Sequence, residues 1–283
     1  MKPSQTAALP DQHEAVAERQ SMPAAQLVAH DSREERAATM DRDGFVFFPT
    51  VISKEEVREL RACSDRIQTV EIAGWDSIGS NGNGIKTIQN SFNRDALYLD
   101  YLDKPGVIEL VEDVLGDDCH IIQMTQWNTG RREDQGMHAD WKPIVLPDDV
   151  GADPRVNIPA LIMTAHFYLD DMYEDLGPTR VIPGTHRAGS KPHHDSDQWN
   201  NVQEQSILCK AGDVIVFRSD LWHRGGANRT DQVRYLLQVH YANRWIAQRF
   251  PPFLSFQFNP EILSQATPRQ RRLLGEHRAG PFA

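Results

Sequence analysis

Short strand-like runs separated by Gly, Pro and Asp turns dominate the chain from residue 119 onward, and they constrain its fold more than any other feature. These runs are 119–128, 135–141, 160–169, 179–183, 205–209, 213–218 and 233–243. Many short strands at this spacing are typical of a β-sandwich or barrel rather than of an alternating α/β sheet. We therefore predict a mainly β fold with flanking helices, a cupin-like double-stranded β-helix or jelly roll.

The first part of the chain is expected to add an arm and helices to this fold. Residues 1–37 contain few large apolar side chains, so we interpret them as a mobile N-terminal arm with room for one short helix. Residues 38–283 are expected to form one domain. Within it, Ser53 and Glu56 form a capping box that opens a helix to about Ile67. Further elements are expected as a strand near 44–48, a strand at 84–92, and helical stretches near 94–103, 106–115 and 260–277.

Residues 74–84 are rich in Gly and Asn, and their composition is consistent with either a hairpin or a mobile flap.

Charge and cysteine content exclude several classes of protein. The chain has 30 basic and 40 acidic residues with no basic cluster, which argues against a nucleic-acid binder. No apolar run approaches the roughly 20 residues that cross a bilayer, and the N-terminus lacks the apolar core of a secretory signal. The three cysteines are far apart and odd in number, so no disulfide framework is expected. These features favour a protein of the cytoplasm, without nucleic-acid or membrane partners.

An HxD motif, His138-Ala139-Asp140, lies in one of the predicted strands. Side chains at i and i+2 of a strand point to the same face, so both can reach one ion. Two His and one carboxylate on one face of a metal are typical of non-haem Fe(II) oxygenases. HxD alone is a weak signal, because His193-His194-Asp195 also fits. That second match lies in a polar coil too close to His223 for several strands to intervene, so we prefer the first.

His223 follows the apolar strand 213–218 and is the expected third ligand, with a structural His at a strand end as the alternative. Arg234 interrupts the next apolar strand. An inward guanidinium needs an anion, and its planar fork fits a carboxylate. The C5 carboxylate of 2-oxoglutarate would be that anion, and an ion pair with a nearby Asp or Glu is the alternative.

Together these motifs resemble those of the phytanoyl-CoA dioxygenase (PhyH) family. The run Gly177-Pro178-Thr179-Arg180-Val181-Ile182-Pro183-Gly184-Thr185-His186-Arg187 resembles a signature that the family carries between its ligand pairs. The ending Arg271-Arg272-Leu273-Leu274-Gly275-Glu276-His277 is also similar to many members. The likeness runs from about residue 40 to 280. One departure is Leu176, where members often carry Asn in a turn.

The resemblance implies Fe(II) bound by His138, Asp140 and His223, with 2-oxoglutarate chelating the iron and Arg234 anchoring its far carboxylate. O2 is the second co-substrate. Gln135 resembles a glutamine that contacts the co-substrate in some members, although its spacing alone fits an ordinary turn residue. Gln89, on an earlier strand, is a further candidate for the same role.

The expected activity is oxidation of an unactivated C–H bond in a small-molecule metabolite, in natural-product tailoring. Hydroxylation, desaturation, cyclisation and epoxidation all remain open. Trp127, Trp141 and His166 are expected to line the substrate pocket, with a purely packing role as the alternative for each. A homodimer is compatible with the sequence. Two other functions stay open, namely a jelly-roll metal enzyme without 2-oxoglutarate and a non-catalytic binding module of the same fold.

Overall fold

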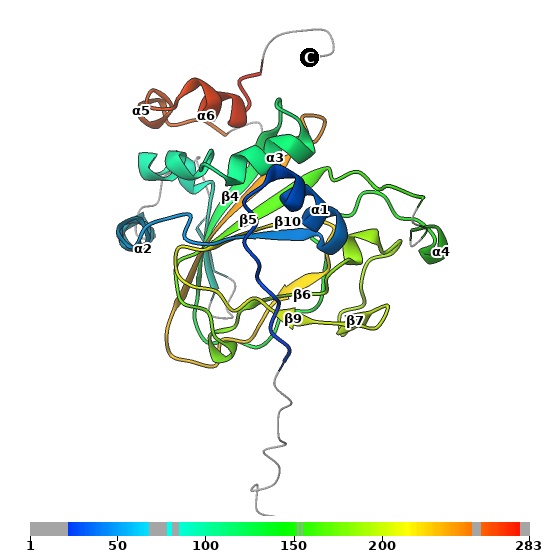
Figure 1. Ribbon diagram of the computed structural model, residues 1–283. Helices are drawn as coiled ribbons and strands as arrows, with labels where there is room; N and C mark the ends of the chain where they lie inside the picture. The colour runs from blue at the N-terminus through cyan, green and yellow to red at the C-terminus, as the bar shows by residue number, and fades with distance from the viewer. Residues whose placement is uncertain are drawn as a thin grey trace, which may run out of the picture.

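The computed structural model describes residues 22–67, 78–80, 85–151, 153, 155–250 and 256–277. Its main element is a seven-stranded antiparallel sheet in the order β1-β10-β5-β12-β4-β3-β2. A three-stranded sheet, β11-β6-β9, lies on the side of the large sheet away from helix α3 (Figure 1). A hairpin, β7-β8, completes the strands of the described ranges. Two facing antiparallel sheets with outer helices confirm the predicted jelly roll.

The strands are β1 Phe45–Phe48, β2 Ile78–Ser80, β3 Ile85–Gln89, β4 His120–Thr129, β5 Ile162–Tyr168, β6 Thr179–Val181, β7 Gln198–Trp199, β8 Val202–Gln203, β9 Gln205–Ser206, β10 Val214–Arg218, β11 His223–Gly225 and β12 Arg234–Ala242. The helices are α1 Arg33–Asp43, α2 Lys54–Ile67, α3 Val107–Leu115, α4 Asp148–Gly151, α5 Pro260–Leu263 and α6 Pro268–Leu273. Four 3₁₀ turns are η1 Ser91–Asn93, η2 Ala96–Tyr101, η3 Glu174–Leu176 and η4 Thr185–Arg187.

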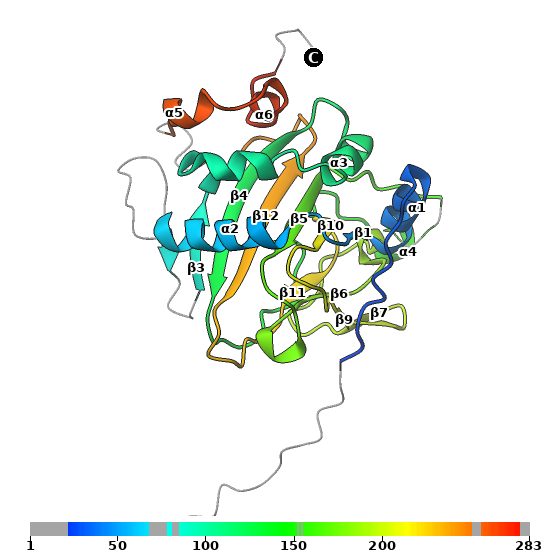
Figure 2. The same cartoon turned by 60° about the vertical axis from the view of Figure 1, so that its left-hand side comes forward.

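Strand β12 separates the apolar core from a polar interior. Its residues Leu237, Val239 and Tyr241 are fully buried in the largest hydrophobic cluster, on the helix-covered face. The residues between them point to the opposite face, because successive side chains of a strand alternate. Helices α2 and α3 cross the outer face of β4, β12 and β5 (Figure 2), which seals the apolar side. The inner face is thereby left to polar side chains.

Local capping defines the helices as the sequence predicts. The amide of Ser53 donates to the Glu56 carboxylate, and the Glu56 amide donates to Ser53 Oγ, so the predicted capping box opens α2. Helix α1 is capped by Ser32 and ends at Gly44, whose φ of 82° suits a residue without a side chain.

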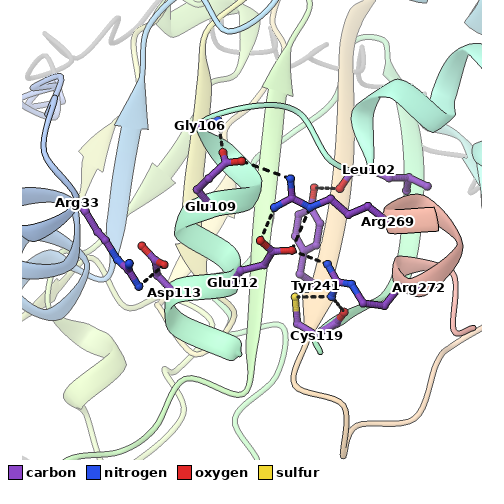
Figure 3. Close-up of polar contacts among 10 residues, drawn as sticks. All are labelled: Arg33, Leu102, Gly106, Glu109, Glu112, Asp113, Cys119, Tyr241, Arg269 and Arg272. Carbon is purple, nitrogen blue, oxygen red and sulfur yellow. Dashed lines mark hydrogen bonds and ion pairs between the residues drawn. The ribbon is translucent and has the colours of Figure 1, made fainter. Parts of the chain in front are cut away.

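Ion pairs attach the C-terminal helix α6 to helix α3 on the outer face of the sheet. Glu112 of α3 accepts hydrogen bonds from both Arg269 and Arg272 of α6 (Figure 3). Arg272 also donates to the Cys119 carbonyl oxygen at 2.6 Å, just before β4. This Arg–Glu–Arg cluster explains how a polar helix packs at an apolar face.

Three expectations of local structure differ from the observed one. The predicted strand 135–141 is wrong, because this segment faces only the short β11 and makes a single bridge, between His138 and His223. The predicted strand 84–92 ends at Gln89, since Asn90 adopts a left-handed φ of 50°. The predicted helix 260–277 is two short helices, because Thr267 caps a new start at Pro268.

The N-terminal region carries more structure than a helix alone. Residues Ala24 and Ala29 form parallel bridges to Ser206 and Phe47, and α1 crosses the predicted boundary at residue 37. The domain limits themselves stay a prediction. Of the segment 74–84, strand β2 is described and the other residues lie outside the described ranges. Within those ranges no helix combines the length and apolar character that crossing a membrane requires.

His186 of the predicted signature joins the small sheet to α1. Its side chain is only 2% exposed, and its Nε2 donates to the Asp41 carbonyl oxygen at 3.0 Å. A Cβ at Gly44 would lie 2.6 Å from its Nδ1, so the ring packs directly on the helix end. Burial, and then the charge of Arg218, lower the pKa of His186 to about 4. The ring is therefore neutral in the folded protein at neutral pH.

We expect this buried His to make folding stability depend on pH. Protonation favours the unfolded chain, where the ordinary pKa is 6.5, so stability is full above that value and falls as the pH drops toward 4. The loss from this group alone is about 3 kcal/mol at pH 4. In His186→Gln, which keeps a donor for Asp41, urea unfolding of metal-free protein should show a shallower decline over this range. His193→Gln, in an exposed loop, is the control, and equal slopes in both variants would contradict the assignment.

Candidate functional site

A cavity of about 530 Å³ lies between the two sheets. Its size is within the range of small-molecule sites. The nine residues predicted to form the site all line this cavity, namely Gln89, Trp127, Gln135, His138, Asp140, Trp141, His166, His223 and Arg234. These residues come from distant parts of the chain and meet because β3, β4, β5 and β12 present one face to β11.

His138, Asp140 and His223 converge on one point of the cavity wall. One carboxylate oxygen of Asp140 lies 3.6 Å from Nε2 of His138 and 3.6 Å from Nε2 of His223. Among the described residues this is the group of His, Cys, Asp or Glu with metal-binding geometry, its ligand atoms all within 4.8 Å of one another. Reciprocal backbone hydrogen bonds of 3.0 and 2.8 Å join His138 to His223 and bring the two rings together.

Backbone carbonyl groups orient both imidazoles. Nδ1 of His138 donates to the Gly136 oxygen and Nδ1 of His223 donates to the Leu221 oxygen, each at 2.9 Å. With the proton on Nδ1, the lone pair of each ring lies on Nε2, which faces Asp140. Hydrogen bonds of this kind fix the tautomer and the direction of metal-binding histidines.

The electrostatics of the three groups favour a bound cation. Burial raises the pKa of Asp140, but the neighbouring His223 more than offsets this, so the carboxyl pKa lies below its usual range. Burial, and then His223, lower the pKa of His138. For His223, burial lowers the pKa while the charge of Asp140 raises it, and the balance is a raised pKa. One ionised carboxylate and two imidazole nitrogens are donors that suit Fe(II).

Arg234 is a buried cation that forms no ion pair with a carboxylate of the described residues. It opens β12 and is 9% exposed, and its Nε has no hydrogen-bond partner among the described residues. The nearby carboxylate of Asp170 instead accepts from Arg61 and from the Tyr235 amide. Burial lowers the pKa of Arg234 to about 10. Because an unpaired buried charge is costly, this end of the cavity favours an anionic ligand over the ion pair considered as its alternative.

Gln135 lies beside Arg234. The backbone N–H of Gln135 donates to the Gly225 carbonyl oxygen at 2.9 Å. The side-chain Oε1 of Gln135 accepts from the backbone N–H of Gly225, also at 2.9 Å. A Cβ at Gly225 would lie 2.9 Å from Gln135 Oε1 and 3.9 Å from an Arg234 nitrogen. Gln135 therefore fixes the strand that carries His223, and its contact with a co-substrate stays a prediction.

Trp127 and His166 belong to one buried hydrogen-bonded chain. Trp127 Nε1 donates to Gln238 Oε1 at 2.8 Å, and Gln238 Nε2 donates to His166 Nε2 at 3.0 Å. Burial, and then the charge of His223, hold the pKa of His166 well below its usual value. The ring packs edge-on against Phe217, which in turn packs against His223. This neutral chain supports the wall behind the three converging groups.

The second HxD match does not join the site. His194 is 79% exposed in its side chain and pairs with the exposed Asp195. Its ring lies against Gly136, where a Cβ would come within 2.0 Å of it, and its carbonyl oxygen accepts from the Met137 amide. These residues therefore support the loop that precedes His138, and the absence of a side chain at Gly136 makes that contact possible.

Sequence reasoning missed several cavity residues. Gln238 and His240 lie on β12 at even spacing from Arg234, so the strand alternation could have identified them. Arg249 follows the end of β12, where no periodic pattern points to it. With Gln238, His240 and Arg249 included, the cavity contains more polar side chains than the sequence predicted.

Comparison with known proteins agrees with this geometry. The profile of the family described as phytanoyl-CoA dioxygenase (PhyH) matches residues 40–236. L-Proline trans-4-hydroxylase of Streptomyces griseoviridis is 24% identical over 250 residues, which cover 75% of this chain and 88% of that protein.

Two solved structures share the fold. HygX from Streptomyces hygroscopicus, with nickel and 2-oxoglutarate bound, has a TM-score of 0.61 at 15% identity, covering 77% of this chain and 90% of HygX. The non-haem 2-oxoglutarate-dependent epimerase SnoN from nogalamycin biosynthesis has a TM-score of 0.58 at 20% identity, covering 74% and 82%. The expected family, enzyme class and cofactors are thereby confirmed. The chain belongs to the phytanoyl-CoA dioxygenase (PhyH) family of non-haem iron enzymes, which use Fe(II), 2-oxoglutarate and O2.

Proposed function

We propose that His138, Asp140 and His223 bind Fe(II), that Arg234 binds the C5 carboxylate of 2-oxoglutarate, and that the enzyme oxidises an unactivated C–H bond of a small metabolite. The observation that carries this proposal is the buried guanidinium of Arg234, which pairs with no carboxylate of the described residues and shares a cavity with three converging metal donors. Fe(II) with 2-oxoglutarate and O2 supplies the oxidant for such a bond while 2-oxoglutarate becomes succinate and CO2.

The protein's own groups bind and orient the reactants. His138, Asp140 and His223 would hold Fe(II) at the cavity wall, where the ion would supply coordination positions for 2-oxoglutarate and O2. Arg234 directs the co-substrate along β12, and Gln135 holds β11 in place beside it. The fully buried Phe217 excludes water from the side of the site behind His223. The substrate would bind at the polar inner wall of the cavity.

The proposed substrate is a compact natural product or an amino-acid-like metabolite. HygX has been solved with hygromycin B bound and SnoN with nogalamycin RO, and another relative is named for the hydroxylation of L-proline. The inner wall supports the same proposal, because Gln89 and Thr125 offer hydrogen bonds to a polar molecule. Hydroxylation is the simplest outcome, and desaturation, cyclisation or epoxidation would use the same residues.

Replacement of Asp140 tests the metal site and separates the two HxD motifs. In Asp140→Ala, the affinity for Fe(II) or Co(II) should fall roughly 100-fold or more, because the charged donor between the two rings is lost. In Asp195→Ala the affinity should be unchanged, since this exposed carboxylate pairs with His194 and does not line the cavity. Anaerobic Co(II) titration followed by visible absorption measures both. Equal affinities in the two variants would exclude the proposed ligand set.

Replacement of Arg234 tests the co-substrate. With Fe(II) bound under anaerobic conditions, 2-oxoglutarate should produce a metal-to-ligand charge-transfer band. Arg234→Met should weaken 2-oxoglutarate binding by about 100-fold, since two charged hydrogen bonds are lost. Binding of 2-oxovalerate, which lacks the C5 carboxylate, should be weak and equal in both proteins. If Arg234→Met lowers the affinity for both oxoacids alike, Arg234 does not bind the C5 carboxylate.

A further inference from the structure

The cavity is cationic although the protein is acidic. The chain carries a formal net charge of −10. The cavity lining nevertheless includes Arg132, Arg224, Arg234 and Arg249, and among carboxylates only Asp140 within the described ranges. Arg224 is neutralised by Glu204, a buried carboxylate that accepts two hydrogen bonds from it and does not line the cavity. Three arginines are therefore left to face ligands, more than one dicarboxylate co-substrate explains.

Strand register separates these arginines into two ends. Arg234 is paired with Thr129 across the sheet, and Arg132 adds its charge at the same end. His240 is paired with Gln123 six residues further along β12. At about 3.3 Å per residue, the two rows lie about 20 Å apart. Arg249 belongs to the second row, since its amide donates to the Ile122 carbonyl oxygen at 2.8 Å.

The co-substrate is too short to contact both ends of the cavity. Four C–C bonds of about 1.5 Å join the first and last carbons of 2-oxoglutarate, so these atoms are at most about 6 Å apart. With its C5 carboxylate at Arg234, 2-oxoglutarate ends well before the row of His240 and Gln123. The same register places Gln89 beside Thr125, four residues from the Arg234 row. Gln89 therefore lies nearer the second end than its predicted co-substrate role requires.

At the second end, the Arg249 guanidinium lies near side chains that still have hydrogen-bonding atoms available for a ligand. Arg249 is exposed and lines the cavity, and its guanidinium makes no hydrogen bond or ion pair within the described part of the chain. Gln123 Nε2 donates to Thr125 Oγ1, which leaves its carbonyl oxygen free to accept. His240 Nδ1 is bonded to Thr164 Oγ1 at 2.9 Å, so its Nε2 remains for a ligand. Trp141 and Ile162 add apolar wall next to these groups.

We infer that the substrate carries a carboxylate, that Arg249 binds this carboxylate, and that Gln89, Gln123 and His240 contact the polar groups next to it. The inference rests on the proposed function, because it assigns Arg234 to the co-substrate. Two anions then enter one cavity from opposite ends, with the metal ligands on the wall between them. Arg249 selects acidic substrates and holds their other end toward the converging His138, Asp140 and His223.

Ligand binding in the loaded enzyme tests this inference without turnover. We would use the protein with Zn(II), a diamagnetic stand-in, and excess 2-oxoglutarate, which keeps Arg234 occupied. The probes are compact carboxylic acids, each paired with its neutral amide, such as L-proline with L-prolinamide and benzoate with benzamide. Saturation-transfer NMR should show that acids bind at least about tenfold more tightly than their amides.

Matched variants assign the preference to one residue. Arg249→Gln should abolish the preference for acids, and Arg249→Glu should reverse it in favour of the amides. Arg131→Gln should keep it, because Arg131 is a surface residue paired with Asp231 outside the cavity. No binding of acids, no preference over amides, or a preference that survives in Arg249→Gln would each overturn the inference. Failure of the wild-type protein to bind 2-oxoglutarate, measured first, would instead overturn the proposed function.

Discussion

The reciprocal backbone hydrogen bonds between His138 and His223 are the contact on which the candidate site depends. They join a loop to the edge of the small sheet at a single pair of residues. This one bridge sets the two rings 4.4 Å apart and leaves Asp140, two residues on, to close the group from the cavity side. Carbonyl oxygens of the same two segments then orient each ring. The relative positions of the three predicted metal ligands therefore depend on backbone contacts, and their side chains supply the donor atoms.

Alternation along β12 lets one strand serve both stability and function. Its outward residues Leu237, Val239 and Tyr241 are fully buried on the helix-covered face, and its inward residues are Arg234, Leu236, Gln238 and His240. Burying polar groups inside a protein is costly unless they are paired. The chain from Trp127 through Gln238 to His166 supplies such pairing behind the metal donors, whereas Arg234 and His240 keep atoms for ligands. The apolar face thus stabilises the sheet while the polar face remains available.

The sequence predicted what depends on local patterns. The capping box of Ser53 and Glu56 and the strand alternation around Arg234 need only neighbouring residues, and both lie where expected. The strand expected at 135–141 failed because strand pairing depends on a partner, and β11 offers only three residues. The two HxD motifs share one local pattern, and the polar coil around the second motif with its short spacing to His223 favoured the first. In the structure His138 lines the cavity, whereas His194 lies in an exposed loop. Arg249 lies beyond the strand, where no pattern applies.

Net charge proved a poor guide to the ligands of this protein. A formal charge of −10 and the lack of a basic cluster in the sequence argued against large anionic partners such as nucleic acid. The same chain gathers arginines from β11, β12, the loop before His138 and the segment after β12 around one cavity. Fields inside a low-dielectric cavity depend on these few groups more than on the solvated acids outside. An acidic surface and a cationic interior are therefore compatible, and together they favour small anions that fit within the cavity over large ones that must approach the surface.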